Sequence, residues 1–343
     1  MKPIITVIMS VYNADEYLEY TIASIMNQTF KDFEAIIIND ASNDNTKLIL
    51  SKIKDPRFII INNTVNKGLT VNLNTAINMA RGEYIIRIDS DDICLEERFQ
   101  KQLDYLRNHP KVDVLGTNAY LIDMHNSIVG VTDEETDLRR IKTKTMFLNP
   151  FIHPTIMAKT DVLKNYFYNE SYRTCQDFEL WTRIQKKCCF ANMCTPLIFY
   201  RLNAKGATRS ARNKILDRIE LLVPIVSQSI NQHGLDVSED TLKKIIALAL
   251  QAKCYDKEDV YKAYSIVRDA DIDREMAFSC VRYFGLNLIQ KKEYRLFLIG
   301  MTRLLRYYCR IIGVRIGSFY VARKLRVAIV NHEELAISTL RKG

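Results

Sequence analysis

The chain has 343 residues, of which 48% are hydrophobic, and it contains 11 glycines and 7 prolines. This length exceeds the usual size of a single hydrophobic core, and the composition excludes a fibrous, disordered or low-complexity protein. The formal net charge is +9, and the eight cysteines form neither a CxxC pair nor a zinc-ligand spacing, which predicts reduced thiols in the cytosol.

The sequence predicts neither a cleaved signal nor a membrane span. The first residues run directly into strand-like alternation, without the charged, apolar and small-residue regions of a secretory signal. No uncharged apolar stretch approaches the roughly 20 residues that a bilayer-spanning helix needs. We therefore expect a cytoplasmic protein.

Short β-rich runs alternate with helical patterns in the first part of the chain. Buried strands are predicted at residues 4–9, 35–38, 58–61 and 84–88. Apolar side chains with helical spacing lie between and after them: Leu18, Ile22 and Ile25; Leu48, Ile49 and Ile53; Leu69, Leu73, Ile77 and Ala80; Leu95, Phe99, Leu103 and Leu106. This alternation predicts an α/β fold with a mostly parallel, Rossmann-like sheet and helices on both faces. Ligands of such sheets bind beyond the carboxyl ends of the strands.

The pattern changes near residue 212, so we predict one domain at 1–212 and a helical C-terminal region at 213–343. The predicted helices of this region span residues 215–232, 238–253, 257–268 and 274–290. Residues 291–326, the basic segment, hold ten Lys or Arg against one acid, a charge of +9 that equals that of the whole chain. Its interleaved aromatic and aliphatic residues favour an anionic membrane surface. A solvated helix face ranks second, and nucleic acid ranks last.

Three carboxylates follow the fourth predicted strand. Asp89, Asp91 and Asp92 place like charges where a buried strand meets a loop, which destabilises the fold unless a cation lies among them. Hard divalent ions take oxygen ligands, usually one or two carboxylates plus phosphate oxygens of a substrate. The run therefore predicts a metal site for a phosphate-bearing ligand. The alternative is that these residues cap the next helix, for which one Asp would suffice.

Polar residues also end the other strands. Tyr12 and Asn13 follow the first strand, where Tyr12 either flanks a base or packs against the fold. Asp40 follows the second strand, where it either accepts hydrogen bonds from a base or forms an Asx turn. Gly68 permits close backbone approach after the third. The sequence contains neither a GxGxxG nor a Walker A motif, which argues against a dinucleotide dehydrogenase and a P-loop NTPase.

An ordered set of short motifs resembles the family 2 glycosyltransferases over about residues 4–210. The set comprises Ser-Val-Tyr-Asn at 10–13, Asn-Asp-Ala-Ser-Asn-Asp at 39–44, Asn-Lys-Gly-Leu at 66–69, Ala-Arg-Gly-Glu-Tyr-Ile at 80–85 and Asp-Ser-Asp-Asp at 89–92. Each piece is weak, but the order and spacing are specific. The resemblance implies a GT-A fold, a nucleotide-sugar donor that is commonly UDP-linked, a divalent metal and inversion at the anomeric carbon.

The resemblance also implies roles for individual residues. Asp40 would bond uracil, Asp89 would reach the ribose or sugar, and Asp91 of the Asp-x-Asp (DXD) motif would hold Mn²⁺ or Mg²⁺ against the diphosphate. Many relatives carry an Arg before the Asn of the third helix, but Leu73 stands there in this chain. The predicted nucleotide- and donor-binding residues are Val11, Tyr12, Asn13, Asp40, Asn66, Gly68, Asp89 and Ser90.

Sugar transfer with inversion needs a base that removes the proton of the acceptor hydroxyl. The run that begins at Cys175 resembles the family's acidic-Asp-x-x-Leu-Trp pattern, with Gln176 in place of the first acid. We therefore predict Asp177 as the catalytic base, with Glu179 as the fallback, while helix capping is the alternative role for Asp177. His153 resembles a family position near the acceptor pocket, where it either completes the metal shell or is a hydrogen-bonded structural residue.

Cations on the loop after the last predicted strand suggest a lid over the phosphates. Arg201, Lys205 and Arg209 are the candidate contacts, because such a loop can close over a bound donor. A solvated interdomain linker is the equally weighted alternative.

Together these features predict an inverting, metal-dependent glycosyltransferase that moves one sugar from a nucleotide-sugar to a lipid-linked or glycan acceptor in polysaccharide biosynthesis. Single transfer is preferred because the chain lacks the Gln-x-x-Arg-Trp run of processive relatives; its only Trp is Trp181. We expect a peripheral location on the inner face of the cell membrane and no nucleic-acid partner, and dimerisation stays open. The alternatives are a sugar nucleotidyltransferase and a non-catalytic membrane- or nucleic-acid-binding module.

Overall fold

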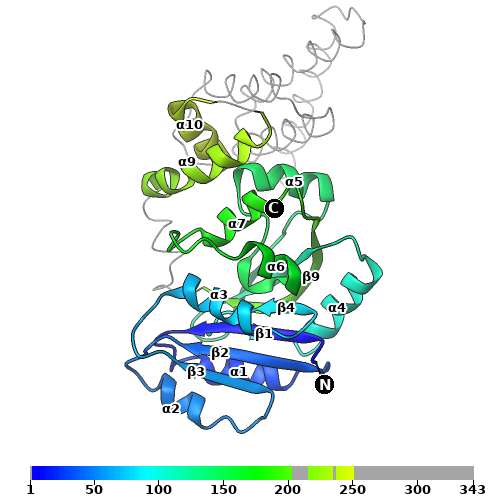
Figure 1. The fold of residues 1–343 in the computed structure, drawn as a ribbon, viewed down its shortest axis with the longest axis vertical. Coiled ribbons are helices and arrows are strands. Elements are labelled where there is room, and N and C mark those ends of the chain that lie inside the picture. The colour runs from blue at the N-terminus through cyan, green and yellow to red at the C-terminus, as the bar shows by residue number, and fades with distance from the viewer. Residues whose placement is uncertain (1, 203–214, 235–236, 251–343) are drawn as a thin grey trace, which may run out of the picture. The chain divides into compact units, whose positions relative to one another are not determined.

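The computed structural model of the chain describes residues 2–202, 215–234 and 237–250 (Figure 1). The chain divides into two compact units, Met1–Ser229 and Ile230–Gly343. Most of the second unit, with the predicted helices at 257–268 and 274–290 and the basic segment, lies outside the described residues. The predicted boundary between residues 212 and 213 also lies outside them, so the domain division stays a prediction.

One mixed sheet organises the first unit. Its strands follow the order β3-β2-β1-β4-β8-β6-β9-β5, and β7 pairs with β6. The described strands are β1 (Ile5–Val11), β2 (Phe33–Asn39), β3 (Phe58–Asn62), β4 (Tyr84–Arg87), β5 (Ile93–Cys94), β6 (Val114–Ile122), β7 (Ile128–Val131), β8 (Met157–Lys159) and β9 (Phe190–Arg201).

The two halves of the sheet differ in strand direction. Strands β3, β2, β1 and β4 are parallel, as β-rich runs joined by helical crossovers require. In the other half β8 is antiparallel to both β4 and β6, β5 is antiparallel to β9, and β7 is antiparallel to β6, while β6 and β9 are parallel. The α/β prediction is confirmed, and the predominance of parallel pairing is limited to the first half.

Helices flank the sheet in the first unit, and further helices follow it in the chain (Figure 1). Their bounds are α1 (Leu18–Met26), α2 (Thr46–Ser51), α3 (Leu69–Met79), α4 (Arg98–Asn108), α5 (Leu138–Phe147), the 3₁₀ turn η1 (His153–Thr155), α6 (Thr160–Tyr166), α7 (Gln176–Ile184), α9 (Ile215–Asn231) and α10 (Glu239–Ala249). Gln185 Nε2 donates to Ser229 Oγ at 2.8 Å and so ties α9 to the end of α7. None of the described helices is long and apolar enough to cross a membrane.

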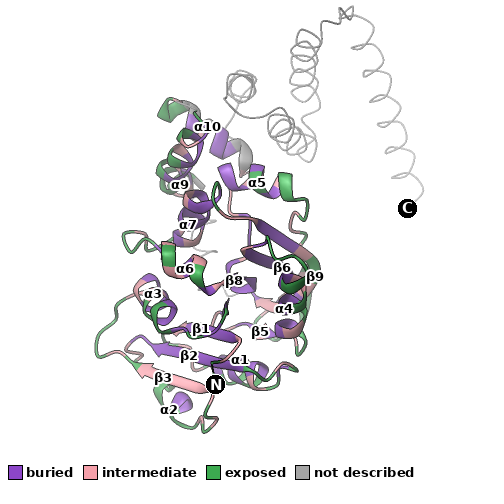
Figure 2. Ribbon diagram, turned by 45° about the vertical axis from the view of Figure 1, so that its right-hand side comes forward, coloured by how far each residue is buried: buried purple, intermediate pink, exposed green. Residues whose placement is uncertain are grey.

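Two apolar clusters cover the two faces of the sheet. Figure 2 shows the buried residues, polar ones included, in purple. Val7 and Met9 of β1 point to one face, with α1, α2 and α4, and Ile8 points to the other, with α3, α6 and α7. This alternation follows from the two-residue period of a strand. Trp181 of α7 is fully buried in the second cluster, so the helix that begins with Gln176 is held firmly beside the strand ends.

Two details depart from the predicted pattern. Leu48 is 56% exposed, whereas Ile49 and Leu50 face the core, because the six-residue helix α2 buries a different face from the one predicted. Strand β3 is half-buried rather than buried, since it lies at the edge of the sheet and has a neighbour on one side only.

Candidate active site

The loops after β1 and β2 meet at the carboxyl edge of the parallel strands. Asn13 adopts a left-handed backbone (φ 48°), its amide donates to Ser42 Oγ at 3.0 Å, and its Oδ1 accepts from the Asn43 amide at 2.9 Å. Val11 is the buried last residue of β1, and the neighbouring Tyr12 is 50% exposed. The structure therefore places Tyr12 and Asn13 at the edge where the sequence predicts the nucleotide, and their contacts with it stay predictions.

Asp40 anchors the loop between β3 and α3. Its Oδ1 accepts from Asn63 Nδ2 and the Lys67 amide, and its Oδ2 accepts from the Gly68 amide, each at 2.8 Å. The Asn66 side chain bonds the Asp40 carbonyl at 3.3 Å. Burial by itself raises the pKa of Asp40, but these hydrogen bonds hold that pKa below its usual value. Asn72 also hydrogen-bonds the carboxylate, which is 2% exposed, so the four acceptor positions of Asp40 are taken up inside the fold, and a contact with uracil stays a prediction.

Asp89 is paired with a buried arginine that sequence analysis did not single out. Arg87 is 3% exposed, and its Nη1 donates to Asp89 Oδ2 at 2.7 Å while its Nη2 donates to Oδ1. The Asp89 side chain keeps 33% of its surface exposed at the strand end. A bidentate pair fixes both groups in one geometry, so Asp89 has a defined orientation at the carboxyl edge of the sheet.

Asp92 points away from this edge and is fully buried. Its Oδ1 accepts from the Arg201 amide at 2.9 Å, and its Oδ2 has no hydrogen-bond partner among the described residues. Burial and the like charges of Asp89 and Asp91 raise the pKa of Asp92 well above its usual value. The expectation that all three acids gather around a cation is therefore wrong, because the Asp92 side chain is buried against the end of β9. Within the described part of the chain, no group of three or more His, Cys, Asp or Glu side chains could hold a metal.

The remaining acids still suit a cation that is brought by the donor. Asp91 is half-buried beside Asp89, and the Ser90 carbonyl between them accepts from Thr21 Oγ1 at 2.9 Å. A positive ion beside Asp91 would relieve the repulsion that raises the pKa of Asp92. Because hard divalent ions need only one or two carboxylates once phosphate oxygens are present, the residues fit a metal held by Asp91 and a diphosphate.

Asp177 lies in the first turn of α7, after Cys175 in a left-handed conformation. Its Oδ2 accepts from Asn149 Nδ2, and its side chain is 15% exposed. Burial raises the pKa of Asp177, and this effect is partly offset by hydrogen bonds from the Phe178 amide and Asn149 and by the charge of Arg87. A carboxylate with a raised pKa is a stronger base, so the environment suits the predicted role.

His153 lies beside Asp177. Its Nε2 is 2.8 Å from Tyr168 Oη, and its Nδ1 is 4.0 Å from Asp177 Oδ2. Burial, with the nearby charge of Arg87, lowers the pKa of His153 well below its usual value, so the ring is neutral at pH 7. With Tyr168 donating, Nε2 accepts and Nδ1 carries the proton. This arrangement matches the structural role for His153 and leaves neither ring nitrogen directed at Asp91.

The prediction of a fallback base is corrected. Glu179, the fallback base, is 1% exposed and accepts from Arg183 Nε at 2.8 Å and Nη2 at 3.2 Å, so it is an ion-pair partner inside the fold. Gln176, which replaces the family's first acid, is 6% exposed. Asp177 is therefore the more accessible of the predicted acids on α7.

Arg201 is not a lid residue. It ends β9 at 3% exposure, its Nε donates to the Asp91 carbonyl, and its Nη1 donates to the Asp123 carbonyl, both at 2.9 Å. Its guanidinium stacks 3.9 Å above the Tyr17 ring. Burial in these contacts keeps Arg201 from reaching a phosphate in solvent, and instead it braces the loop that carries Asp91. Lys205 and Arg209 lie outside the described residues.

Sequence reasoning missed Arg87, Asn149 and Tyr168. A signal was present for Arg87, because a charged residue inside the apolar run 84–88 must find a partner when it is buried. No local pattern marks Asn149 or Tyr168, which reach the site only through tertiary packing around α7.

Residues 6–167 match Glycosyl transferase family 2. An O-antigen biosynthesis glycosyltransferase of Escherichia coli (WbnJ) is 33% identical over 60% of this chain and 83% of its own length. An uncharacterized glycosyltransferase of Methanocaldococcus jannaschii is 37% identical over 56% of this chain, which spans slightly less than two thirds (66%) of that relative. The UDP-Glc:alpha-D-GlcNAc-diphosphoundecaprenol beta-1,3-glucosyltransferase WfaP of Escherichia coli is 29% identical over 65% of this chain and 86% of its length.

Solved structures share the fold. Staphylococcus aureus TarS 1-349 in complex with UDP-GlcNAc superposes with a TM-score of 0.56 at 16% identity, covering 88% of this chain and 91% of that one. The mannosyltransferase PcManGT of Pyrobaculum calidifontis, in complex with GDP-Man and Mn²⁺, gives 0.51 at 17% identity, covering 85% and 88%. These likenesses confirm the predicted GT-A fold. The chain belongs to glycosyl transferase family 2 and is a glycosyltransferase.

Proposed function

We propose that this glycosyltransferase is inverting and metal-dependent, and that it moves one sugar from a UDP-sugar to a lipid-linked or glycan acceptor in surface polysaccharide biosynthesis. The observation that carries the proposal is the position of Arg87, which pairs with Asp89 beside the metal residue Asp91 and whose charge also acts on Asp177. Arg87 therefore lies near both the proposed donor-side acid, Asp89, and the proposed acceptor-side base, Asp177.

The relatives support the finer points. WfaP is named for a UDP-sugar donor and a diphosphoundecaprenol acceptor, and WbnJ is named for O-antigen biosynthesis. The structures of similar fold were solved with UDP-GlcNAc, and with GDP-Man and Mn²⁺. On this chain the residue that we propose for the metal is Asp91.

In the proposed reaction, Asp177 takes the proton of the acceptor hydroxyl as that oxygen attacks the anomeric carbon. The bond between this carbon and the diphosphate breaks as the new glycosidic bond forms on the opposite face of the sugar. Asn149 orients the Asp177 carboxylate through its hydrogen bond to Oδ2. A divalent cation held by Asp91 and the diphosphate would stabilise the charge on the leaving group as a Lewis acid.

The test separates donor binding from transfer. Asp91→Asn should abolish the Mn²⁺-dependent part of the thermal stabilisation by UDP-sugars, since a bound ligand raises apparent stability. Asp177→Asn should keep that stabilisation and lower kcat about 10²–10⁴-fold, the usual contribution of a general base. The exposed Asp133 supplies the control variant Asp133→Asn. Normal turnover by Asp177→Asn would remove the base assignment.

Product analysis distinguishes the alternative functions. A transferase releases UDP, a nucleotidyltransferase releases pyrophosphate, and a non-catalytic module releases neither. A panel of UDP-, GDP- and dTDP-sugars in the same assay identifies the donor.

We also propose that the basic segment holds the enzyme on the anionic inner face of the cell membrane. Its ten Lys or Arg against one acid support this location, because each cation near an anionic surface contributes about 1 kcal/mol. Flotation with phosphatidylglycerol vesicles should show binding that falls with salt and with the charge reversal Arg323→Glu/Lys324→Glu. Binding of equal strength to uncharged vesicles would contradict the proposal.

A further inference from the structure

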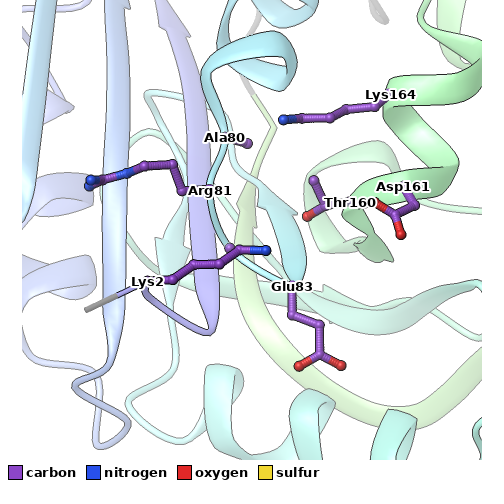
Figure 3. Close-up of a pocket in the computed structure, with 8 residues that line it drawn as sticks. Lys2, Ala80, Arg81, Glu83, Thr160, Asp161 and Lys164 are labelled. Carbon is purple, nitrogen blue, oxygen red and sulfur yellow. The ribbon is translucent and has the colours of Figure 1, made fainter.

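A pocket lies at the end of the sheet opposite to the candidate active site. Its volume is about 400 Å³, and its lining includes Lys2, Arg81, Glu83, Thr160, Asp161 and Lys164 (Figure 3). Lys2 precedes β1, and Arg81 and Glu83 precede β4, so these residues mark the amino ends of the strands. The acids predicted to bind donor and metal lie at the carboxyl ends.

Two lysines reach into this pocket from opposite sides. Figure 3 shows the side chains of Lys2 and Lys164 extending toward each other, whereas Arg81 extends away. Arg81 is already paired, since its Nη2 lies 2.5 Å from Glu34 Oε2. Among the described residues, neither Lys2 nor Lys164 has a hydrogen-bond or ion-pair partner. Two ammonium groups are thus available to the same space.

A buried hydroxyl in the same lining also lacks a partner. Thr160 is 5% exposed, and its Oγ1 makes no hydrogen bond within the described part of the chain. Its amide, in contrast, donates to the Glu83 carbonyl at 3.0 Å. Buried hydroxyls nearly always have a partner, and Oγ1, which has less than 1 Å² of accessible surface, can gain one from the pocket by rotation about the Cα–Cβ bond.

The wall beneath these groups is rigid. Gly82 donates its amide to Thr6 Oγ1 at 2.8 Å, and a Cβ added to Gly82 would lie 2.5 Å from the Thr6 nitrogen. The turn before β4 is therefore pressed against β1. Close packing of this kind holds Thr160, through its bond to Glu83, in a fixed position relative to the pocket.

The acids of the lining limit the kind of ligand. In Figure 3 the carboxylates of Glu83 and Asp161 point away from the two ammonium groups. With Arg81 neutralised by Glu34, the charges of Lys2 and Lys164 are balanced by these two acids. The two lysines then attract an anion only at short range, because the pocket as a whole has no net charge. This favours a compact oxyanion that accepts several hydrogen bonds at once.

We propose that Lys2, Lys164 and Thr160 form a binding site for a phosphate group, separate from the donor site. The two ammonium groups supply charge-assisted hydrogen bonds to phosphate oxygens, and Thr160 Oγ1, once rotated toward the pocket, donates to a third. The phosphate belongs either to a soluble metabolite or to a lipid headgroup, and both sources present the same oxygens to these donors.

Titration of the full-length protein with inorganic phosphate and glycerol 3-phosphate, in EDTA and followed by calorimetry, tests the site. We expect saturable binding that Lys2→Gln, Lys164→Gln and Thr160→Val each weaken by about tenfold, the usual effect of losing such a bond. Lys47→Gln, at an exposed lysine on α2, should bind like the wild type. Thr160→Val removes an unsatisfied hydroxyl, so its thermal stability should not fall, which separates loss of binding from loss of fold.

Vesicle binding identifies the source. If phosphatidylglycerol vesicles bind Lys164→Gln more weakly than Lys47→Gln, the phosphate is a lipid headgroup. If only binding of the small phosphates falls, the ligand is soluble. Absence of saturable phosphate binding by the wild type up to about 10 mM, or equal affinities for Lys164→Gln and Lys47→Gln, would overturn the proposal. Neither result depends on the glycosyltransferase reaction.

Discussion

Replacement of Arg87 by methionine should both destabilise the protein and change its pH dependence. Arg87 is 3% exposed and bonds both oxygens of Asp89. Breaking a buried ion pair by removing one partner costs about 3–5 kcal/mol, but Asp89 is one third exposed and regains water, so we expect about 2 kcal/mol. For a unit of this size that corresponds to a loss of about 4–8 °C in Tm.

The same change should raise the pKa of Asp177. Burial raises this pKa, and Arg87 is one of the groups that oppose the rise. Asp177 acts as a base only when it is deprotonated, so a higher pKa moves the acid limb of the kcat/KM profile to higher pH. We therefore expect Arg87→Met to lose more activity near pH 6 than near pH 9, measured as UDP release at a fixed temperature below both Tm values.

A double variant separates the two effects. Arg87→Met combined with Asp89→Asn removes both charges of the pair, so stability should recover toward the wild type while the profile stays shifted. If Arg87→Met alone kept the wild-type pH profile and showed the full loss of stability, the reasoning would be refuted. Arg87 would then be an ion-pair partner with no influence on Asp177.

Two further predictions follow from the corrected residues. Glu179→Gln should lower the unfolding free energy by about 3 kcal/mol in urea, because it leaves Arg183 without its charged partner; lost turnover with unchanged stability would instead make Glu179 the base. Arg201→Met removes hydrogen bonds to the carbonyls of Asp91 and Asp123, so calorimetry should show about tenfold weaker Mn²⁺-dependent donor binding, and equal affinity would mean that Asp91 is held by other contacts.

Local sequence patterns were sufficient for the elements of the first half of the sheet and for the residues at its carboxyl edge. The apolar runs at 4–9, 35–38, 58–61 and 84–88 became β1 to β4 because strand periodicity is a property of neighbouring residues. In parallel strands the carboxyl ends meet at one edge, so Asn13, Asp40 and Asp89 could be placed together without a structure.

The second half of the sheet could not be predicted in the same way. Strands β5 and β8 have two and three residues, too few to show a period, and they exist because longer neighbours pair with them. Whether a polar residue at a strand end faces solvent also depends on these distant partners. The side chains of Asp92 and Arg201 face inward because the end of β9 is hydrogen-bonded to the loop that carries Asp91.

The amino-acid sequence alone determined the family motifs, the α/β class and the candidate base Asp177, since each depends on residue types at short spacing. Tertiary structure alone decided which charges pair and which remain available, because ion pairs join residues that are distant along the chain. Arg87 near Asp177, and Lys2 opposite Lys164, are neighbours only after folding. Chemistry at both ends of the sheet therefore rests on packing that no local pattern encodes.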